Sequence, residues 1–269
     1  MDAVDIESKA KEIKQSVVKT VTKAKGGHVG TSLSEVDILA ALYFGILNVD
    51  PAKPEDPDRD RLILSKGHGS EGLYCSLAAK GFFPAGLLEH YLERDCPLTI
   101  HPTRHVPGVE MNTGALGHGF SNAVGVALSA KLRKKSYRAF VVTGDGELQE
   151  GANWEAAMAA SHFGLGNLAV IVDKNGLQLA DKVETTMGID PLDEKFRAFG
   201  FEVREVDGHS IPELVATFSS LDYTGPRPHA IIARTTKGKG ISFMEDVAEW
   251  HHRIPTPEEG ERALKELEP

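Results

Sequence analysis

The first fifty residues carry a helical pattern of apolar positions. Between residues 5 and 24, apolar side chains recur at intervals of three and four, at Ile6, Ala10, Ile13, Val17 and Val21. This spacing places them on one face of an amphipathic helix. A second apolar segment covers residues 35–47, and the serine before it, Ser34, is a suitable N-cap. We expect a helix in each segment, followed by a proline-rich loop at residues 49–60.

After this loop the pattern changes to short, continuous apolar runs separated by helix-like stretches. The runs cover residues 61–65, 139–143, 168–173, 201–206 and 229–235. Continuous apolar strands that alternate with helices predict an α/β fold with a mostly parallel central sheet and helices on both faces. In such sheets ligands bind beyond the carboxyl ends of the strands. Each run here is followed by a cluster of Gly, His, Asp or Lys residues, so we expect the site at that edge.

Composition narrows the possible functions. The formal net charge of −9 disfavours nucleic acid held by a general positive field. The two cysteines cannot form a disulfide framework, and their spacing does not suggest zinc. The composition shows neither disorder nor the long apolar run of a membrane span. The charged N-terminus lacks the apolar core of a secretory signal, so we expect a cytoplasmic protein without a membrane partner.

Residues 67–72 match the pattern GxGxxG, which occurs in dinucleotide-binding turns. That site also needs a second strand ending in an acid about twenty residues later. Glu89 has this spacing, but residues 81–94 do not have a strand pattern, and His68 would crowd the turn. The match alone is therefore weak. No P-loop pattern occurs in the sequence.

The sequence Gly-Asp-Gly at residues 144–146 follows an apolar run and precedes the helix-forming residues 152–164. A hairpin turn would need a second strand, and an EF-hand would need acids at alternate positions. The remaining interpretation is a strand-to-helix turn at which a helix N-terminus faces an anion. The next run ends near Asn175 at the same sheet edge. Asp145, Asn175 and the Leu177 carbonyl could therefore give Mg²⁺ or Ca²⁺ the oxygen ligands these ions prefer.

Gly-Asp-Gly followed about thirty residues later by Asn resembles the thiamine diphosphate motif. Four segments narrow the resemblance to the transketolase family, and they occur in the family's order: residues 25–39, 56–74, 113–127 and 144–160. The resemblance implies a three-layer thiamine diphosphate-binding fold. It also implies that residues 1–269 form a single diphosphate-binding domain, the N-terminal subunit of a split transketolase.

The resemblance further implies roles for individual residues. Asp145, Asn175 and Leu177 would hold the metal, and Gly146 would approach the diphosphate through its backbone. Residues beside the cofactor would be His68, Gly114, Leu116, Gly146, Asn175 and His251. The active-site histidines would be His28, His68, His101 and His251. Glu150 and Glu155 match acids that lie toward the subunit interface.

Other residues depart from the family pattern or have an ordinary explanation. His118 stands where the family often has Gln, and His252 where Gly commonly follows the family histidine. Lys237 could reach an anion, but a lysine on a surface loop is an equal interpretation. A lone histidine is more often structural than catalytic, and we assign that role to His90, His105, His162 and His229.

Thiamine chemistry requires a C2 carbanion, and in this family the Glu that promotes its formation lies in the following pyrimidine-binding domain. We expect residues 1–269 to contain neither this domain nor the family's C-terminal domain. The resemblance therefore implies a separate C-terminal subunit in an α₂β₂ assembly. The assembly would transfer a two-carbon ketol unit between sugar phosphates of the pentose phosphate pathway.

Two alternatives stay open at this point. Another thiamine enzyme, such as a 1-deoxyxylulose-5-phosphate synthase or the α chain of a 2-oxoacid dehydrogenase, would share the Gly-Asp-Gly and Asn. Residues 100–103 and 113–119 favour transketolase. The chain could instead be a non-catalytic binding or regulatory subunit, although the retained histidines argue against this.

Overall fold

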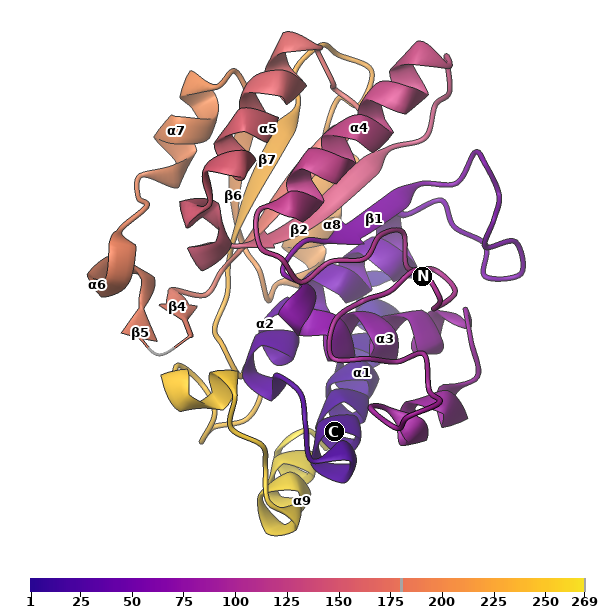
Figure 1. Ribbon diagram of the computed structural model, residues 1–269, viewed down its shortest axis with the longest axis vertical. Helices are drawn as coiled ribbons and strands as arrows, with labels where there is room; N and C mark the ends of the chain where they lie inside the picture. Colours follow the sequence, from indigo (N-terminus) through magenta and orange to yellow (C-terminus); the bar gives the residue numbers. More distant parts are fainter. Residues whose placement is uncertain (180, 269) are drawn as a thin grey trace.

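The computed structural model describes residues 1–179 and 181–268 (Figure 1). The described residues contain a parallel sheet with strand order β1-β2-β3-β7-β6. Its strands are β1 (Arg61–Leu64), β2 (Ala139–Gly144), β3 (Leu168–Lys174), β6 (Glu202–Asp207) and β7 (His229–Arg234). These are the five predicted strands. A short antiparallel pair, β4 (Leu177–Gln178) and β5 (Asp181–Lys182), follows β3 outside the sheet.

Helices cover both faces of the sheet, as predicted. Along β2, Phe140 and Val142 belong to one buried core, while Ala139 and Val141 belong to the other. This alternation follows from the two-residue period of a strand. The first core includes helices α1 (Ala3–Ala24), α2 (Val29–Ala41), α3 (Ser70–Lys80) and α8 (Ile211–Ser219). The second includes α4 (His118–Leu132), α5 (Gly151–His162) and α7 (Leu192–Ala198).

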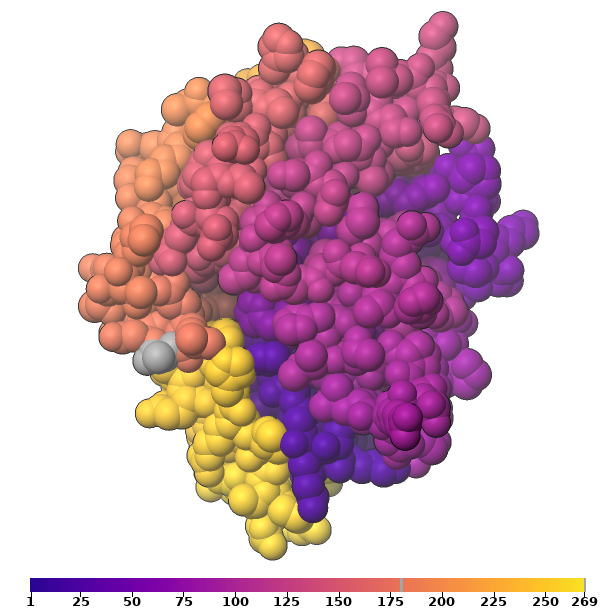
Figure 2. Space-filling view, in the orientation of Figure 1, coloured from indigo at the N-terminus to yellow at the C-terminus, as the bar shows by residue number. Residues whose placement is uncertain are grey.

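The C-terminal segment packs back against the N-terminal helix. It contains a 3₁₀ turn, η5 (Ala248–His251), and helix α9 (Pro257–Glu266). Thr256 caps α9, because its side chain accepts from the Glu259 amide while the Glu259 side chain accepts from the Thr256 amide. Helix α9 contacts α1, and the space-filling view shows this yellow segment beside the indigo one (Figure 2). Residues near the two ends of the sequence therefore build neighbouring surface.

The second helix begins earlier than its sequence pattern predicts. Helix α2 begins at Val29 with His28 as the N-cap, so the expected cap at Ser34 is wrong. Every residue of α2 is buried, and packing on all sides supports the helix where no side-chain cap is present. The Ser34 hydroxyl bonds instead to the Thr31 carbonyl and, at 2.6 Å, to Asp173. Ser34 thus joins the helix to the end of β3.

The all-round burial of α2 also corrects the expectation that the chain has no long apolar run. Residues Val29–Ile46, which include the π-helical turn η1 (Leu42–Ile46), are apolar and long enough to cross a membrane by length and composition. However, 83% of this stretch is buried inside the fold, where α2 contacts helices α1, α3 and α8. A core helix accounts for its composition.

Residues 81–94 form no strand, in agreement with the sequence pattern. They contain the 3₁₀ helix η3 (Ala85–His90). The glycines of the GxGxxG match have another explanation: a Cβ on Gly69 or Gly72 would lie 2.5 Å or 2.8 Å from the Glu35 carboxylate. These glycines let α2 and α3 approach one another around a buried acid, so they do not indicate a dinucleotide-binding turn.

Candidate active site

A cleft of about 420 Å³ opens at the carboxyl edge of the sheet. It lies where β1, β2 and β3 end, beside the N-terminus of α2 and the η5 turn. The cleft is lined by all of the residues predicted to bind metal, cofactor or substrate: His28, His68, His101, Gly114, Leu116, Asp145, Gly146, Asn175, Leu177 and His251. Segments more than two hundred residues apart in the sequence thus form a single site. The individual role of each residue stays a prediction.

Asp145 occupies the turn between β2 and the 3₁₀ helix η4 (Gly146–Gln149), as the strand-to-helix interpretation predicted. Its two carboxylate oxygens accept hydrogen bonds from the amides of Gly146, at 2.9 Å, and Gly176, at 2.7 Å. The side chain is 2% exposed, and burial raises its pKa to about 6. A carboxylate held in this way favours a nearby cation, because burial penalises an uncompensated charge.

Asn175 and Leu177 follow β3 and lie beside Asp145 in the cleft. The amide oxygen of Asn175 accepts from the Leu177 amide at 3.1 Å, which fixes the turn between them. The three predicted ligands offer carboxylate, amide and carbonyl oxygens. This donor set fits a hard divalent cation such as Mg²⁺ or Ca²⁺.

Lys237 lies inside this site, so the interpretation of a lysine on a surface loop is wrong. It is 1% exposed and donates to the Leu177 carbonyl at 3.2 Å. Its ammonium is also 2.9 Å from Nδ1 of His251. Burial and the nearby Lys66 lower the pKa of Lys237 to about 8. The Leu177 carbonyl thus already accepts one hydrogen bond, and its second lone pair is the one available to a cation.

The four predicted active-site histidines form one cluster. The His28 ring centroid lies 5.8 Å from that of His68, 6.2 Å from His101 and 5.7 Å from His251. Burial lowers the pKa of all four, to about 4 for His28 and about 2 for His251, where nearby cationic groups add to the effect. At neutral pH they are therefore uncharged imidazoles, able to donate and accept hydrogen bonds.

One further observation fits a polar ligand in the cleft, and another explains the glycine at position 114. Nδ1 of His28 is buried and has no hydrogen-bond partner among the described residues, which costs free energy unless a ligand pairs with it. Gly114 has φ of +138°, and a Cβ there would lie 2.9 Å from the His101 ring. Glycine at this position keeps the backbone close to that histidine.

Glu147 has a structural role that the sequence did not reveal. It is 2% exposed, and its carboxylate accepts from the Gly117 amide at 2.9 Å, the Gly144 amide at 3.1 Å and the Ser65 hydroxyl. These bonds join the end of β1, the end of β2 and the start of α4. The only signal in the sequence was an acid directly after Gly-Asp-Gly, which also fits an ordinary helix start.

A network of buried charged residues lies next to the histidine cluster. Lys66, after β1, pairs with Asp173 at the end of β3 and lies 3.1 Å from Glu35 of α2. Burial would raise the pKa of Asp173, but Lys66 and hydrogen bonds from Ser34 and Thr235 lower it overall. Burial raises the pKa of Glu35 to about 8. Lys66 and Asp173 are therefore both charged at neutral pH, whereas burial favours the protonated form of Glu35.

The other residues that the sequence singles out lie either at the cleft or away from it. His252 lies beside the cluster, with its ring centroid 4.8 Å from that of His28. His118 is exposed, and its Nδ1 lies 3.2 Å from the carbonyls of Ala115 and Leu116. Glu150 is exposed and lines the cleft, whereas Glu155 is exposed on α5 outside it. The histidines assigned structural roles all lie outside the cleft: His90, His105, His162 and His229.

Comparison with known proteins agrees with this geometry. The family model described as "Transketolase, thiamine diphosphate binding domain" matches residues 6–266. The chain is 49% identical to an apulose-4-phosphate transketolase subunit from Actinobacillus succinogenes, over 98% of this chain and 96% of the relative. It is 40% identical to the 6-deoxy-6-sulfo-D-fructose transketolase subunit SqwG of a Clostridium species, over 98% and 97% of the two chains.

Full-length transketolases are similar over part of their length. Human transketolase is 35% identical over 96% of this chain, which spans 41% of that protein. The crystal structure of Campylobacter jejuni transketolase superposes with a TM-score of 0.92 at 30% identity, over 99% of this chain and 43% of that one.

The three hydrogen bonds of Glu147 lead to a prediction for Glu147→Gln. One oxygen of Glu147 faces the Gly117 amide and the other faces the Gly144 amide. The glutamine NH₂ group must then oppose one of these N–H donors. We expect a loss of about 1–3 kcal/mol in the free energy of unfolding, measured by denaturant titration. The exposed Glu150→Gln is the matched control, and equal stabilities of the two variants would contradict this role.

The raised pKa of Glu35 leads to a second prediction. The pKa of Glu35 in the folded state, about 8, lies above its ordinary value of 4.5. The contribution of Glu35 to the free energy of unfolding is therefore complete below its pKa in the unfolded state, and it is lost as the pH rises through about 8. We expect wild type to lose roughly 1–3 kcal/mol relative to Glu35→Gln between pH 5 and pH 9. Stability curves with the same pH dependence for the two proteins would show that Glu35 is ionised in the fold.

Proposed function

The chain belongs to the transketolase family as the N-terminal, thiamine diphosphate-binding subunit of a split enzyme, and we propose that it binds the cofactor with a divalent cation and transfers a two-carbon ketol unit between sugar phosphates. The observation that carries this proposal is the convergence in one cleft of an oxygen donor set and four uncharged histidines. An oxygen set suits a cation that neutralises a diphosphate, and imidazoles suit sugar hydroxyls.

Each group of residues has a defined task in this proposal. Asp145, Asn175 and the Leu177 carbonyl hold the cation, Mg²⁺ or Ca²⁺, which anchors the diphosphate. Thiamine diphosphate, when bound, would supply the carbon nucleophile for ketol transfer. Gly114 and Leu116 border its rings, and Gly146 approaches the diphosphate through its backbone. His68 and His251 contact the cofactor.

The histidine cluster orients the sugar. His28, His101, His68 and His251 present neutral imidazoles, which can accept a hydrogen bond from a sugar hydroxyl or donate one to a carbonyl oxygen. Their low pKa values keep them uncharged over the neutral range. The four histidines can therefore contact several hydroxyl groups without carrying a positive charge themselves.

We infer that a second chain completes the site. Relatives that are themselves named as transketolase subunits match this chain over nearly their whole length, and such a name implies a partner. The partner would be a C-terminal subunit with the pyrimidine-binding domain, and the stoichiometry we propose is α₂β₂. Glu150 at the cleft rim and Glu155 on α5 would face the subunit interface.

The sequence relatives favour transketolase over the other two alternatives. The relatives described above carry transketolase names, as does the solved structure, and the family model is that of transketolase. A non-catalytic subunit would not need a histidine cluster at the cofactor edge. The sugars of this chain are proposed only as phosphorylated ketoses and aldoses.

The partner proposal predicts that activity requires two chains. We expect two-carbon transfer between a ketose phosphate and an aldose phosphate when this chain is mixed with its C-terminal partner, thiamine diphosphate and Mg²⁺. Product formation is followed by chromatography, with each chain alone as the control. Full activity of this chain by itself would overturn the two-subunit proposal.

The cation proposal predicts that Asp145→Ala weakens metal-dependent binding of thiamine diphosphate to the assembled complex by at least about a hundredfold. The substitution removes the charged oxygen ligand, leaving amide and carbonyl oxygens alone. Calorimetry with and without Mg²⁺ measures the effect, and Glu261→Ala, which changes an exposed acid on α9, serves as the control. Unchanged affinity would remove Asp145 from the metal site.

A further inference from the structure

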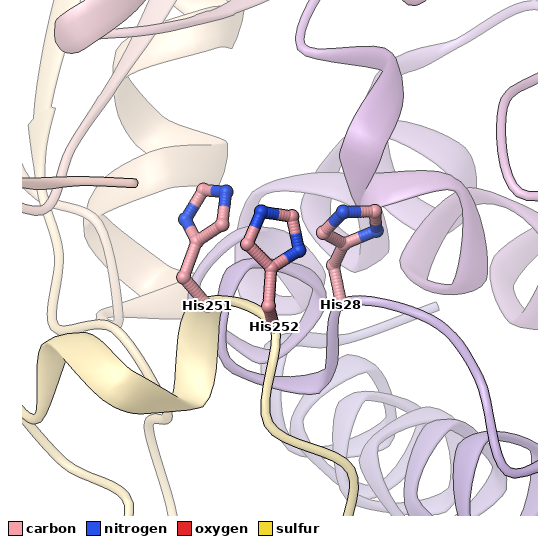
Figure 3. Close-up of side chains that lie close together, drawn as sticks. All are labelled: His28, His251 and His252. Carbon is pink, nitrogen blue, oxygen red and sulfur yellow. The ribbon is translucent and has the colours of Figure 1, made fainter. Parts of the chain in front are cut away.

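His252 forms a compact group with two of the site histidines (Figure 3). His28 comes from the N-cap of α2, whereas His251 and His252 come from the end of the η5 turn. Figure 3 shows the His252 ring between the other two. Its centroid lies 4.8 Å from His28 and 4.7 Å from His251. The proposed sugar transfer gives His252 no task.

The ring nitrogens of these three residues can converge on one ion. One nitrogen from each ring lies within 4.8 Å of the others. A zinc ion at about 2.0–2.1 Å from each nitrogen would bring the nitrogens to about 3.4 Å from one another. The His252 side chain is exposed and can turn toward the buried pair. Nδ1 of His251 faces Lys237, so Nε2 is its nitrogen left for an ion.

The chemistry of the ligands selects the class of ion. Three imidazoles suit Zn²⁺, Ni²⁺ or Co²⁺, whereas Mg²⁺ and Ca²⁺ require oxygen ligands. Burial keeps His28 and His251 unprotonated near neutral pH, so their nitrogen lone pairs are available. This group is therefore chemically distinct from the oxygen set at Asp145, Asn175 and Leu177.

We propose that His28, His251 and His252 form a binding site for a transition-metal dication, with Zn²⁺ as its probe, at the opening of the cofactor cleft. Three protein ligands leave the fourth tetrahedral position open to the cleft. An ion bound there withdraws His28 and His251 from sugar and cofactor. The ion therefore inhibits the enzyme. This inhibition rests on the proposed function, but the binding of the ion does not depend on that function.

Direct metal binding tests the site in the full-length chain. Zn²⁺ is titrated against a chromophoric chelator in excess Mg²⁺, and Co²⁺ is titrated separately while its visible absorption is recorded. We expect wild type to bind one Zn²⁺ and His252→Asn to bind it at least about tenfold more weakly. The Co²⁺ absorption of a nitrogen-ligated, low-coordinate ion should also be lost in the variant. His162→Asn, which changes an exposed histidine outside the cleft, should behave as wild type.

The experiment separates the site from general loss of structure and from the proposed reaction. Because His252 is exposed, the melting temperature of His252→Asn should match that of wild type. Equal Zn²⁺ affinity of wild type and His252→Asn, or no stoichiometric binding by wild type, would overturn the site. With the partner chain, Zn²⁺ should inhibit wild type more strongly than the variant, and equal inhibition would overturn the blocking role. The binding measurement uses no substrate, so failure of the proposed transfer would leave its result intact.

Discussion

The pairing of Lys66 with Asp173 holds together the edge of the sheet on which the cleft is built. Both side chains are almost wholly inaccessible to solvent, and a charge in that position is tolerated only when it is paired and hydrogen bonded. Asp173 also accepts from Ser34 of α2 and from Thr235 after β7. A single carboxylate therefore connects the ends of three strands and one helix. The turns that carry the cleft residues His68 and Asn175 begin at two of these ends, those of β1 and β3.

The burial of Glu35 explains why glycine occupies two positions after β1. Glu35 lies against Lys66 and is buried between α2 and α3, with its carboxylate where a Cβ of Gly69 or Gly72 would be. The turn after β1 is thus shaped by a buried acid. Glu147 has the corresponding role at β2, where it accepts from backbone amides of Gly117 and Gly144. Buried acids such as Glu35 and Glu147 thus fix the positions of the residues that we propose to bind ligands.

Sequence patterns predicted the parts of the structure that depend on local periodicity. The five strands, the first helix and the helical continuation after Asp145 follow from runs of apolar residues and from turn chemistry. The convergence of the site followed from the rule that parallel strands end at one edge. Its residue-level detail came from the resemblance of four segments to one family.

What the sequence missed depends on contacts between distant segments. Ser34 fits an N-cap, but the full burial of α2 extended the helix back to Val29 and placed the Ser34 hydroxyl against Asp173. Lys237 has the sequence context of a surface lysine, yet the chain folds it beneath His251 and onto the Leu177 carbonyl. The hydrogen bond from Lys237 to Leu177 joins residues 60 positions apart, and it leaves no signal in the sequence around either residue. The positions of buried charges are therefore the part of this site for which a structure is needed, and those charges add to the effect of burial in lowering the pKa of His28, His68 and His251.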